Sequence, residues 1–208
     1  MGNVFREAAA MRSMDLSDDA GLLAAAKYAL AHDDDPAHAF QVCRLAVRLF
    51  EQTTAAHGLS SHDKRILAAA ALLHDLGWTT RPEAHQKGSR DIILQASLPG
   101  FDEETIKMIA LVARYHGKTY PANTHKIYRD LSETAQAEVK KLAAILRIAD
   151  GLDRTHAGTV KSLEARLKAD VLTIAVRQEP RSAIDIMGAN RKKGLFEDLF
   201  KVKVVIQD

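Results

Sequence analysis

His74 and Asp75 stand side by side at the end of an alanine- and leucine-rich stretch, residues 68–77, that is typical of a buried helix. Packing alone does not call for an imidazole and a carboxylate at this place. Adjacent side chains on a helix diverge by roughly 100°, so these two can share one ligand only if it lies beyond the helix end. A metal ion is such a ligand, and the pair therefore predicts a metal site.

Other residues with the same ligand chemistry lie in apolar or helical stretches elsewhere in the chain. His38 shares a helix face with Val42, Leu45 and Leu49, at spacings of four, three and four, and therefore points inward with the core. His116 falls on the buried side of its own expected helix. The full set of candidate metal ligands is His38, His74, Asp75, His85, His116 and Asp150.

Asp150 interrupts the apolar face of the longest expected helix, residues 132–156. Burying a lone charge is costly and forces a partner or a protonated state. Arg147 and Arg154, three residues before and four after Asp150, lie on its side of the helix. His156 either closes a pocket at this point or caps the helix, and the sequence leaves both readings open.

The elements that must position these residues are helical as far as about residue 156. Capping residues, prolines and glycines mark where each helix begins and ends; for the first helix the expected cap is formed by Ser17, Asp18 and Asp19. The expected helices run to residue 31, from 36, from 60–61 to 75, from 85 to 95, from 102 to 117 and from 132 to about 156.

Composition changes at about residue 158. Residues 171–177 and 202–206 alternate apolar and polar side chains as strands do, and residues 190–200 are typical of a helix. We therefore expect a mainly α protein with a helical domain over 1–157 and a small α+β appendage over 158–208, built from two or three strands and one helix. The appendage would serve packing or a homodimer contact; Leu195, Phe196 and Phe200 suit either role.

Composition narrows the class of protein. With 208 residues, a net charge of +2 and one cysteine, Cys43, the chain is expected to lack disulfides and thiolate-rich zinc sites. No stretch reaches 18 apolar residues and the N-terminus lacks a signal-peptide core, so we expect a cytoplasmic protein with no membrane contact. Aromatic residues are only 5% of the chain, which argues against nucleic acid as a partner.

The pattern of His38, His74-Asp75 and Asp150 resembles the four-ligand signature of the HD phosphohydrolase superfamily, an all-helical bundle that holds a divalent metal. The segments AAALLHDLG (69–77), LPGF (98–101), LVARYH (111–116) and KLAAILRIADGLDRTH (141–156) look like the C-terminal HD region of the exopolyphosphatase and guanosine pentaphosphate phosphohydrolase (Ppx/GppA) family. The strand-rich segment that follows is similar to the last subdomain of that family. The resemblance implies an HD-domain bundle with the four residues as metal ligands.

The chain also departs from this family. Family members carry an N-terminal actin-like domain in which polyphosphate is hydrolysed, and this sequence contains no counterpart of it. Exopolyphosphatase activity is therefore not carried over. What the resemblance does carry over, residue by residue, is the metal set.

The resemblance extends to a second metal position. The segment HQKGS (85–89) is similar to the one that supplies a second-metal histidine in the binuclear HD-GYP branch, and His116 falls where a further histidine is expected. Gly88 stands where exopolyphosphatase relatives commonly have a histidine. The resemblance thus implies a two-metal site bridged by Asp75, while a structural or substrate-contact role for His85 and His116 stays open.

Imidazole and carboxylate ligands without sulfur suit one or two divalent ions of Mn, Fe, Co, Ni or Mg. Such ions activate water and polarise a phosphoryl oxygen. We expect Asp75, Lys87 and Arg147 to be catalytic, with phosphate charge neutralised by Lys87, Lys118, Arg147 and Arg154. Each basic residue alone could equally be a solvated surface charge, and Arg147 could pair with a carboxylate.

Two functions fit these residues. The first is a metal-dependent phosphohydrolase that uses a metal-activated water to cleave a phosphoester or phosphoanhydride bond of a small phosphorylated compound: a nucleotide, an alarmone or a short polyphosphate. The alternative is a non-catalytic module that binds metal and phosphate and regulates another activity. The complete ligand set favours the enzyme.

Overall fold

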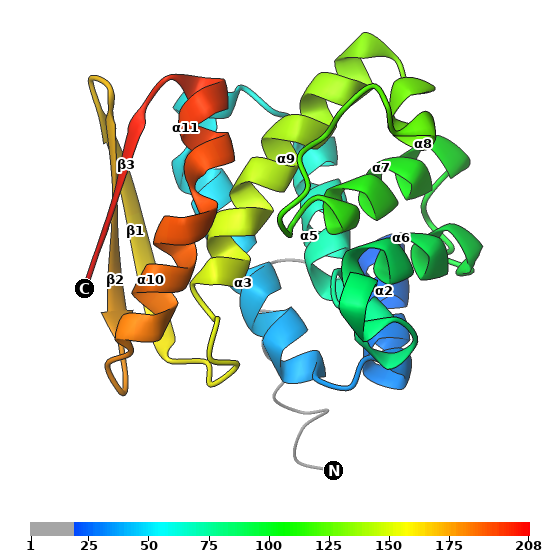
Figure 1. The fold of residues 1–208 in the computed structure, drawn as a ribbon, viewed down its shortest axis with the longest axis horizontal. Coiled ribbons are helices and arrows are strands. Elements are labelled where there is room, and N and C mark those ends of the chain that lie inside the picture. The colour runs from blue at the N-terminus through cyan, green and yellow to red at the C-terminus, as the bar shows by residue number, and fades with distance from the viewer. Residues whose placement is uncertain (1–18) are drawn as a thin grey trace.

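The computed structural model describes residues 19–208 and shows a mainly helical protein with a small sheet at its C-terminal side (Figure 1). Two 3₁₀ turns, Leu76–Thr79 and Pro82–Ala84, connect α5 to α6. The helices are α2 (Ala20–His32), α3 (Pro36–Gln52), α4 (Thr54–His57), α5 (Ser61–Leu73), α6 (His85–Gln95), α7 (Glu103–Arg114), α8 (Lys126–Arg129), α9 (Glu133–Gly151), α10 (Ala183–Lys192) and α11 (Gly194–Phe200).

The first helices begin at the residues that the sequence marks as caps. The Asp19 carboxylate accepts hydrogen bonds from two backbone N–H groups in the first turn of α2. Ser17 and Asp18, considered for the same cap, lie outside the described residues. Pro36 occupies the first turn of α3, directly after the capping residue Asp35, where a missing N–H costs nothing.

Helix α5 runs through the centre of the molecule and packs against α2, α3, α7 and α9. Its residues from Ile66 to Leu73 are all fully buried. A helix that is apolar on every side is stable only when it is surrounded, and the four alanines at 68–71 let its neighbours approach closely. The helix therefore delivers His74 and Asp75 into the interior.

The predicted inward faces of α3 and α9 are confirmed. Val42, Leu45 and Leu49 are fully buried together with His38. In α9 the buried face includes Asp150, and it continues to Asp153 just past the helix. The helix ends at Gly151 rather than near residue 156, so residues 152–156 form turns that bend over the end of the bundle.

The sheet has the order β1 (Val160–Lys168), β2 (Val171–Gln178), β3 (Lys203–Gln207). β1 and β2 are antiparallel, whereas β3 is parallel to β2 and is reached through α10 and α11. Leu172, Ile174 and Val176 point into the core, as the alternation predicts. The single helix expected over 190–200 is in fact two: α10 begins earlier, at Ala183, and α11 follows it.

The C-terminal elements share one continuous hydrophobic core with the helices. α10 and α11 lie between the sheet and α9 (Figure 1). Leu195 and Phe196 are buried inside the chain, and the half-buried Phe200 packs against the same core, so all three have an intrachain packing role. The predicted boundary at 157/158 falls in the turns between α9 and β1. Among residues 19–208, no helix has both the length and the hydrophobicity to cross a membrane.

Candidate metal centre

The structure brings all six predicted ligands to one place, where the ends of five helical elements meet. Each candidate ligand lies in a terminal turn of a helix or just past one. The site is therefore built from helix ends and not from the middle of any helix. His38 lies in the first turn of α3, His74 and Asp75 directly after α5, His85 at the start of α6, His116 just past α7 and Asp150 in the last turn of α9.

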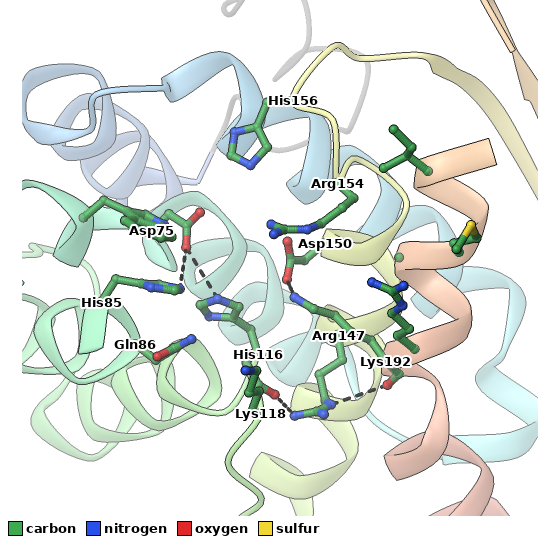
Figure 2. A pocket seen from close by; sticks show the side chains of 16 residues that line it. Asp75, His85, Gln86, His116, Lys118, Arg147, Asp150, Arg154, His156 and Lys192 are labelled. Atoms are coloured by element: carbon green, nitrogen blue, oxygen red, sulfur yellow. Dashed lines mark hydrogen bonds and ion pairs between the residues drawn. The ribbon is translucent and has the colours of Figure 1, made fainter. Parts of the chain in front are cut away.

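Asp75 is the centre of this cluster because its two oxygens face different imidazoles. Oδ2 lies 3.8 Å from Nε2 of His38 and 3.6 Å from Nε2 of His74. Oδ1 lies 3.8 Å from Nε2 of His85 and 3.5 Å from Nε2 of His116, as the dashed lines in Figure 2 show. Asp75 thus stands between two pairs of histidines.

Asp150 completes one of the two sides. Its Oδ1 lies 3.7 Å from Nε2 of His38. Donor atoms of His38, His74 and Asp150 all lie within 4.8 Å of one another, and the same holds for His74, Asp75 and His116. Distances of this size are too long for hydrogen bonds but suit groups that surround a common cation.

The histidine rings are oriented by hydrogen bonds on their far side. Nδ1 of His74 and of His116 donates to a backbone carbonyl three residues earlier, at 2.8 and 2.6 Å. Nδ1 of His38 donates to Oδ2 of Asp153 at 2.8 Å. A donating Nδ1 leaves Nε2 as the free acceptor, which is the arrangement found around protein-bound metals.

The site also leaves buried polar atoms without partners. Within residues 19–208, six buried side-chain nitrogen or oxygen atoms accept or donate no hydrogen bond, and three of them are here: Nε2 of His38, Nε2 of His74 and Oδ1 of Asp75. Such atoms are costly and call for a ligand. Three acceptors converging on one point fit a cation, so the residues present suit the divalent metal that the sequence predicts.

Electrostatics keep the carboxylates ionised. Burial raises the pKa of Asp150, but the charge of Lys192 and the contact with His38 outweigh it and hold that pKa well below the usual value. Burial also opposes ionisation of Asp75, but the neighbouring imidazoles, His74 before His116, lower its pKa nevertheless. Both carboxylates are therefore ionised and able to bind a cation.

The histidines differ in their protonation. Burial, followed by the charge of His74, lowers the pKa of His116 to about 3 and keeps it neutral. Burial also disfavours charge on His38, but Asp150 and Asp153 outweigh burial and raise its pKa to about 10. A divalent cation would displace that proton, since imidazole ligands are neutral.

His85 reaches Asp75 because two glycines let α6 approach the turn after α5. Gly77 and Gly88 pack against each other, and a methyl group on Gly77 would collide with the backbone of His85 and Ser89. The Gly77 N–H donates to Oγ of Ser89 at 2.9 Å, inside the contact. Gly88, which stands where the resembling family commonly has a histidine, thus has a packing role.

A pocket of about 560 Å³ opens onto the cluster. Figure 2 shows Asp75, His85 and His116 on one side of it and Asp150, Arg154 and Lys192 on the other. Helix α10 forms part of its wall. The lining residues are Asp75, Trp78, His85, Gln86, His116, Gly117, Lys118, Arg147, Asp150, Arg154, His156, Ile184, Met187, Gly188, Arg191 and Lys192.

The predicted phosphate-binding residues are not all in this pocket. Lys118 and Arg154 line it with exposed side chains. Lys87 is exposed on α6 and does not line the pocket, whereas its neighbour Gln86 does. The structure therefore leaves Lys87 as a surface charge outside the site.

Arg147 lines the pocket, and its Nε and Nη1 donate to backbone carbonyls. Its guanidinium donates to the backbone carbonyls of Tyr115, at 3.1 Å, of Gly117, and of Lys192, at 3.4 Å. It also lies 4.7 Å from the centre of the Tyr120 ring. Its partners are carbonyls and not a carboxylate, so Arg147 braces the end of α7 against α10.

The sequence reasoning missed Lys192. Its Nζ forms an ion pair with Oδ2 of Asp150, across 42 positions of sequence. The appendage that carries Lys192 was expected to serve packing or a homodimer contact. The sequence carries no clear signal for this contact, because the helix expected over 190–200 places Arg191-Lys192 at its start, whereas in the structure the pair ends α10.

His156 lies at the mouth of the pocket. Its ring stacks on that of His38, with centroids 3.7 Å apart and planes at 9°, and its Nδ1 lies 2.9 Å from Oδ2 of Asp35. Of the two readings that the sequence left open, the structure favours the one in which His156 closes the pocket, since α9 ends before it.

Comparison with the models of known families gives a match. The model of a family described as Ppx/GppA phosphatase, domain III, matches residues 23–183, more than half of the chain. The matched range contains all six candidate ligands and ends at the first residue of α10, before Lys192. A search of curated proteins gives no match.

Proposed function

Because the chain belongs to the Ppx/GppA phosphatase family through its domain III, we propose that it is a metal-dependent phosphohydrolase of the HD type. It would cleave a phosphoester or phosphoanhydride bond in a small phosphorylated compound. The observation that carries this proposal is the position of Asp75, whose two oxygens each face a different pair of histidines within 3.8 Å.

The ligand set divides into two positions that share Asp75. His38, His74, Asp150 and Oδ2 of Asp75 would hold one divalent ion, and His85, His116 and Oδ1 of Asp75 would hold a second. The nitrogen and oxygen donors suit Mn, Fe, Co, Ni or Mg. When bound, such ions supply an activated water molecule and stabilise the charge that develops on phosphoryl oxygens.

The chain's own cations provide the remaining electrostatic stabilisation. Lys118, Arg154 and Arg191 are exposed side chains in the pocket lining, and they attract and orient a phosphate group in front of the ligand cluster. Phosphoryl transfer depends chiefly on such positioning and charge stabilisation. Arg147 acts indirectly, by fixing the backbone on which His116 and Lys118 stand.

Lys192 and Asp153 support the ligands from behind. Lys192 neutralises part of the charge of Asp150 and leaves Oδ1 to face His38. Asp153 holds the ring of His38. Because the partners of a ligand set its direction and basicity, we include both residues in the machinery as positioning groups.

Metal analysis and a substrate panel test the proposal. Protein purified without chelator should carry about one or two transition-metal ions per chain, and the purified protein with Mn²⁺, Mg²⁺ or Co²⁺ should release phosphate from at least one nucleotide, alarmone or oligophosphate. Asp75→Asn should lose both metal and turnover. Metal content below about 0.1 per chain would refute the proposal. Metal retention with tight binding but no turnover of any compound would instead support a regulatory binding module.

A further inference from the structure

The exposed large apolar side chains of this protein gather at the candidate site. Among residues 19–208 they are Trp78, Tyr120, Ile184 and Met187, which are 43%, 43%, 60% and 52% exposed. Trp78, Ile184 and Met187 line the pocket, and Tyr120 packs on the guanidinium of Arg147 in the pocket wall. Single exposed apolar residues are ordinary, but a group that rims one pocket marks a binding surface.

Trp78 lies directly beside a candidate ligand. One face of its indole stacks on the ring of His85, with centroids 4.0 Å apart and planes at 13°. Nε2 of His85 in turn lies 3.8 Å from Oδ1 of Asp75. A second flat ring that stacks on the indole would therefore have its substituents within reach of the ligand cluster.

The helix that carries the other two apolar pocket residues, α10, is held firmly in place. Ile184 and Met187 are three positions apart on α10 and share one face of it. Asp185, fully buried between them, accepts hydrogen bonds from the backbone N–H of Thr155 at 2.8 Å and from Oγ1 of Thr159 at 2.6 Å. Gly188 fits against Gly151 so closely that a methyl group would collide. The apolar face of α10 is thus a fixed wall.

The pocket therefore offers two kinds of chemistry to one ligand. Its basic residues Lys118, Arg154 and Arg191 suit a phosphate, whereas Trp78, Ile184 and Met187 suit an uncharged, flat group. An inorganic polyphosphate is charged along its entire length and would gain nothing from an apolar wall. A nucleoside phosphate has a charged phosphate and a flat, uncharged base. The base can stack on tryptophan whatever the arrangement of its hydrogen-bond donors and acceptors.

Resting on the proposed function, we infer that Trp78, Ile184 and Met187 form a base-binding wall that makes the substrate a nucleoside phosphate and not an inorganic polyphosphate. Base stacking on an aromatic side chain contributes about 5- to 150-fold in affinity. That factor is the discrimination that the wall should provide.

The chain contains a single tryptophan, so intrinsic tryptophan fluorescence reports on Trp78 alone. The purified protein is titrated with adenosine and guanosine, which carry no phosphate to hydrolyse, and with ribose 5-phosphate and tripolyphosphate, which carry no base. N-acetyltryptophanamide corrects for absorbed light. The nucleosides should quench the fluorescence in a saturable manner, and the two compounds without a base should not.

Variants of the wall add a second readout. Ile184→Ser with Met187→Ser should weaken nucleoside binding about 5-fold or more, whereas the matched control, Ile184→Leu with Met187→Leu, keeps an apolar wall and should keep the binding. Trp78→Ala should lower the ratio of kcat/KM for a nucleotide to that for ribose 5-phosphate by about 5- to 150-fold, and Trp78→Phe should retain most of it.

The outcomes separate this inference from the proposed function. Saturable quenching by nucleosides with no hydrolysis of any phosphate would uphold the base-binding wall and refute the enzyme. Equal turnover of tripolyphosphate, ribose 5-phosphate and nucleotides, with no quenching by nucleosides, would uphold the enzyme and refute the wall.

Discussion

Nδ1 of His38 donates a hydrogen bond to Oδ2 of Asp153 over 2.8 Å, and both side chains are almost completely buried. This contact fixes the ring so that Nε2 faces Asp75 and Asp150, at 3.8 and 3.7 Å. A carboxylate behind a ligand imidazole also makes that imidazole a better electron donor. Asp153 would therefore act through His38 on a metal bound at the site.

Replacing Asp153 should weaken metal binding without removing any ligand. We expect Asp153→Asn to reduce the affinity for the divalent ion by about 10- to 100-fold, because the amide keeps the shape but loses the charge behind His38. Competition with a coloured chelator measures the affinity. Asp170→Asn, an exposed aspartate in the turn between β1 and β2, is the matched control. Equal affinity in both variants would contradict the role of Asp153.

The two sides of Asp75 predict a stoichiometry. If each oxygen serves a separate ion, His85→Ala should reduce the metal content from about two ions per chain to about one, and Asp75→Ala should remove both. Elemental analysis after gel filtration gives the numbers. A wild-type protein that binds one ion and keeps it in His85→Ala would rule out the second position.

The candidate ligands that the structure brings together could be recognised in the sequence because several of them break a pattern that physical chemistry makes regular. His38 and Asp150 interrupt apolar helix faces, and the His74-Asp75 pair follows the apolar run 66–73 that ends α5. Lys87 was predicted to bind phosphate, but its neighbour Gln86 lines the pocket instead. Successive residues on α6 are turned by roughly 100°, so the exact rotation of a short helix decides whether position 86 or 87 faces the pocket.

Other parts of the site have no comparable signal. The ion pair of Lys192 with Asp150 depends on how α10 packs on α9. The change of composition near residue 158 indicated a separate appendage and gave no sign of that contact. Strand β1 was not foreseen individually because a register shift between Val160 and Ser162 disturbs its alternation. The partners of Arg147 are backbone carbonyls, which side-chain patterns do not encode.

Lys192 should matter for turnover more than for metal content. In Lys192→Met, Oδ1 of Asp150 still faces His38, so the metal should be retained, while a positive charge in the pocket lining is lost. Removing one group that stabilises developing charge reduces kcat by about 100-fold, and Lys192→Arg should recover part of it. Steady-state kinetics and metal analysis of the same samples check both parts. Loss of metal in the methionine variant would show instead that Lys192 is needed to build the site.

Arg147 should prove structural. Arg147→Lys keeps a positive charge but loses the planar guanidinium whose separate nitrogens reach carbonyls on two elements, so buried acceptors lose their partners. We expect the free energy of unfolding in urea to fall by about 3 kcal/mol while the metal content is unchanged. Arg166→Lys, on an exposed part of β1, should change it by less than about 0.5 kcal/mol. A fully stable Arg147→Lys variant with impaired turnover would return Arg147 to a direct role.

His57 provides a pH-dependent contribution to stability away from the metal centre. It is 1% exposed; its Nε2 donates to the carbonyl of Phe50 at 2.9 Å and its Nδ1 accepts from the N–H of Leu59, also at 2.9 Å. Burial lowers the pKa of His57 below its usual 6.5, so the folded protein binds fewer protons than the unfolded chain just below pH 6.5. The contribution of neutral His57 is therefore complete above that pH and is lost as the pH falls toward the lowered pKa.

The expected result is a stability difference that shrinks on acidification. At pH 8, His57→Gln should lower the free energy of unfolding by about 1–3 kcal/mol, because two buried hydrogen bonds are disrupted. The gap between wild type and variant should narrow below pH 6.5, because protonation of Nδ1 costs the wild type its bond to Leu59 and leaves the glutamine unaffected. Urea titrations of both proteins across this range measure the gap, and a gap that stays constant would mean that His57 has the same pKa in the folded and unfolded states.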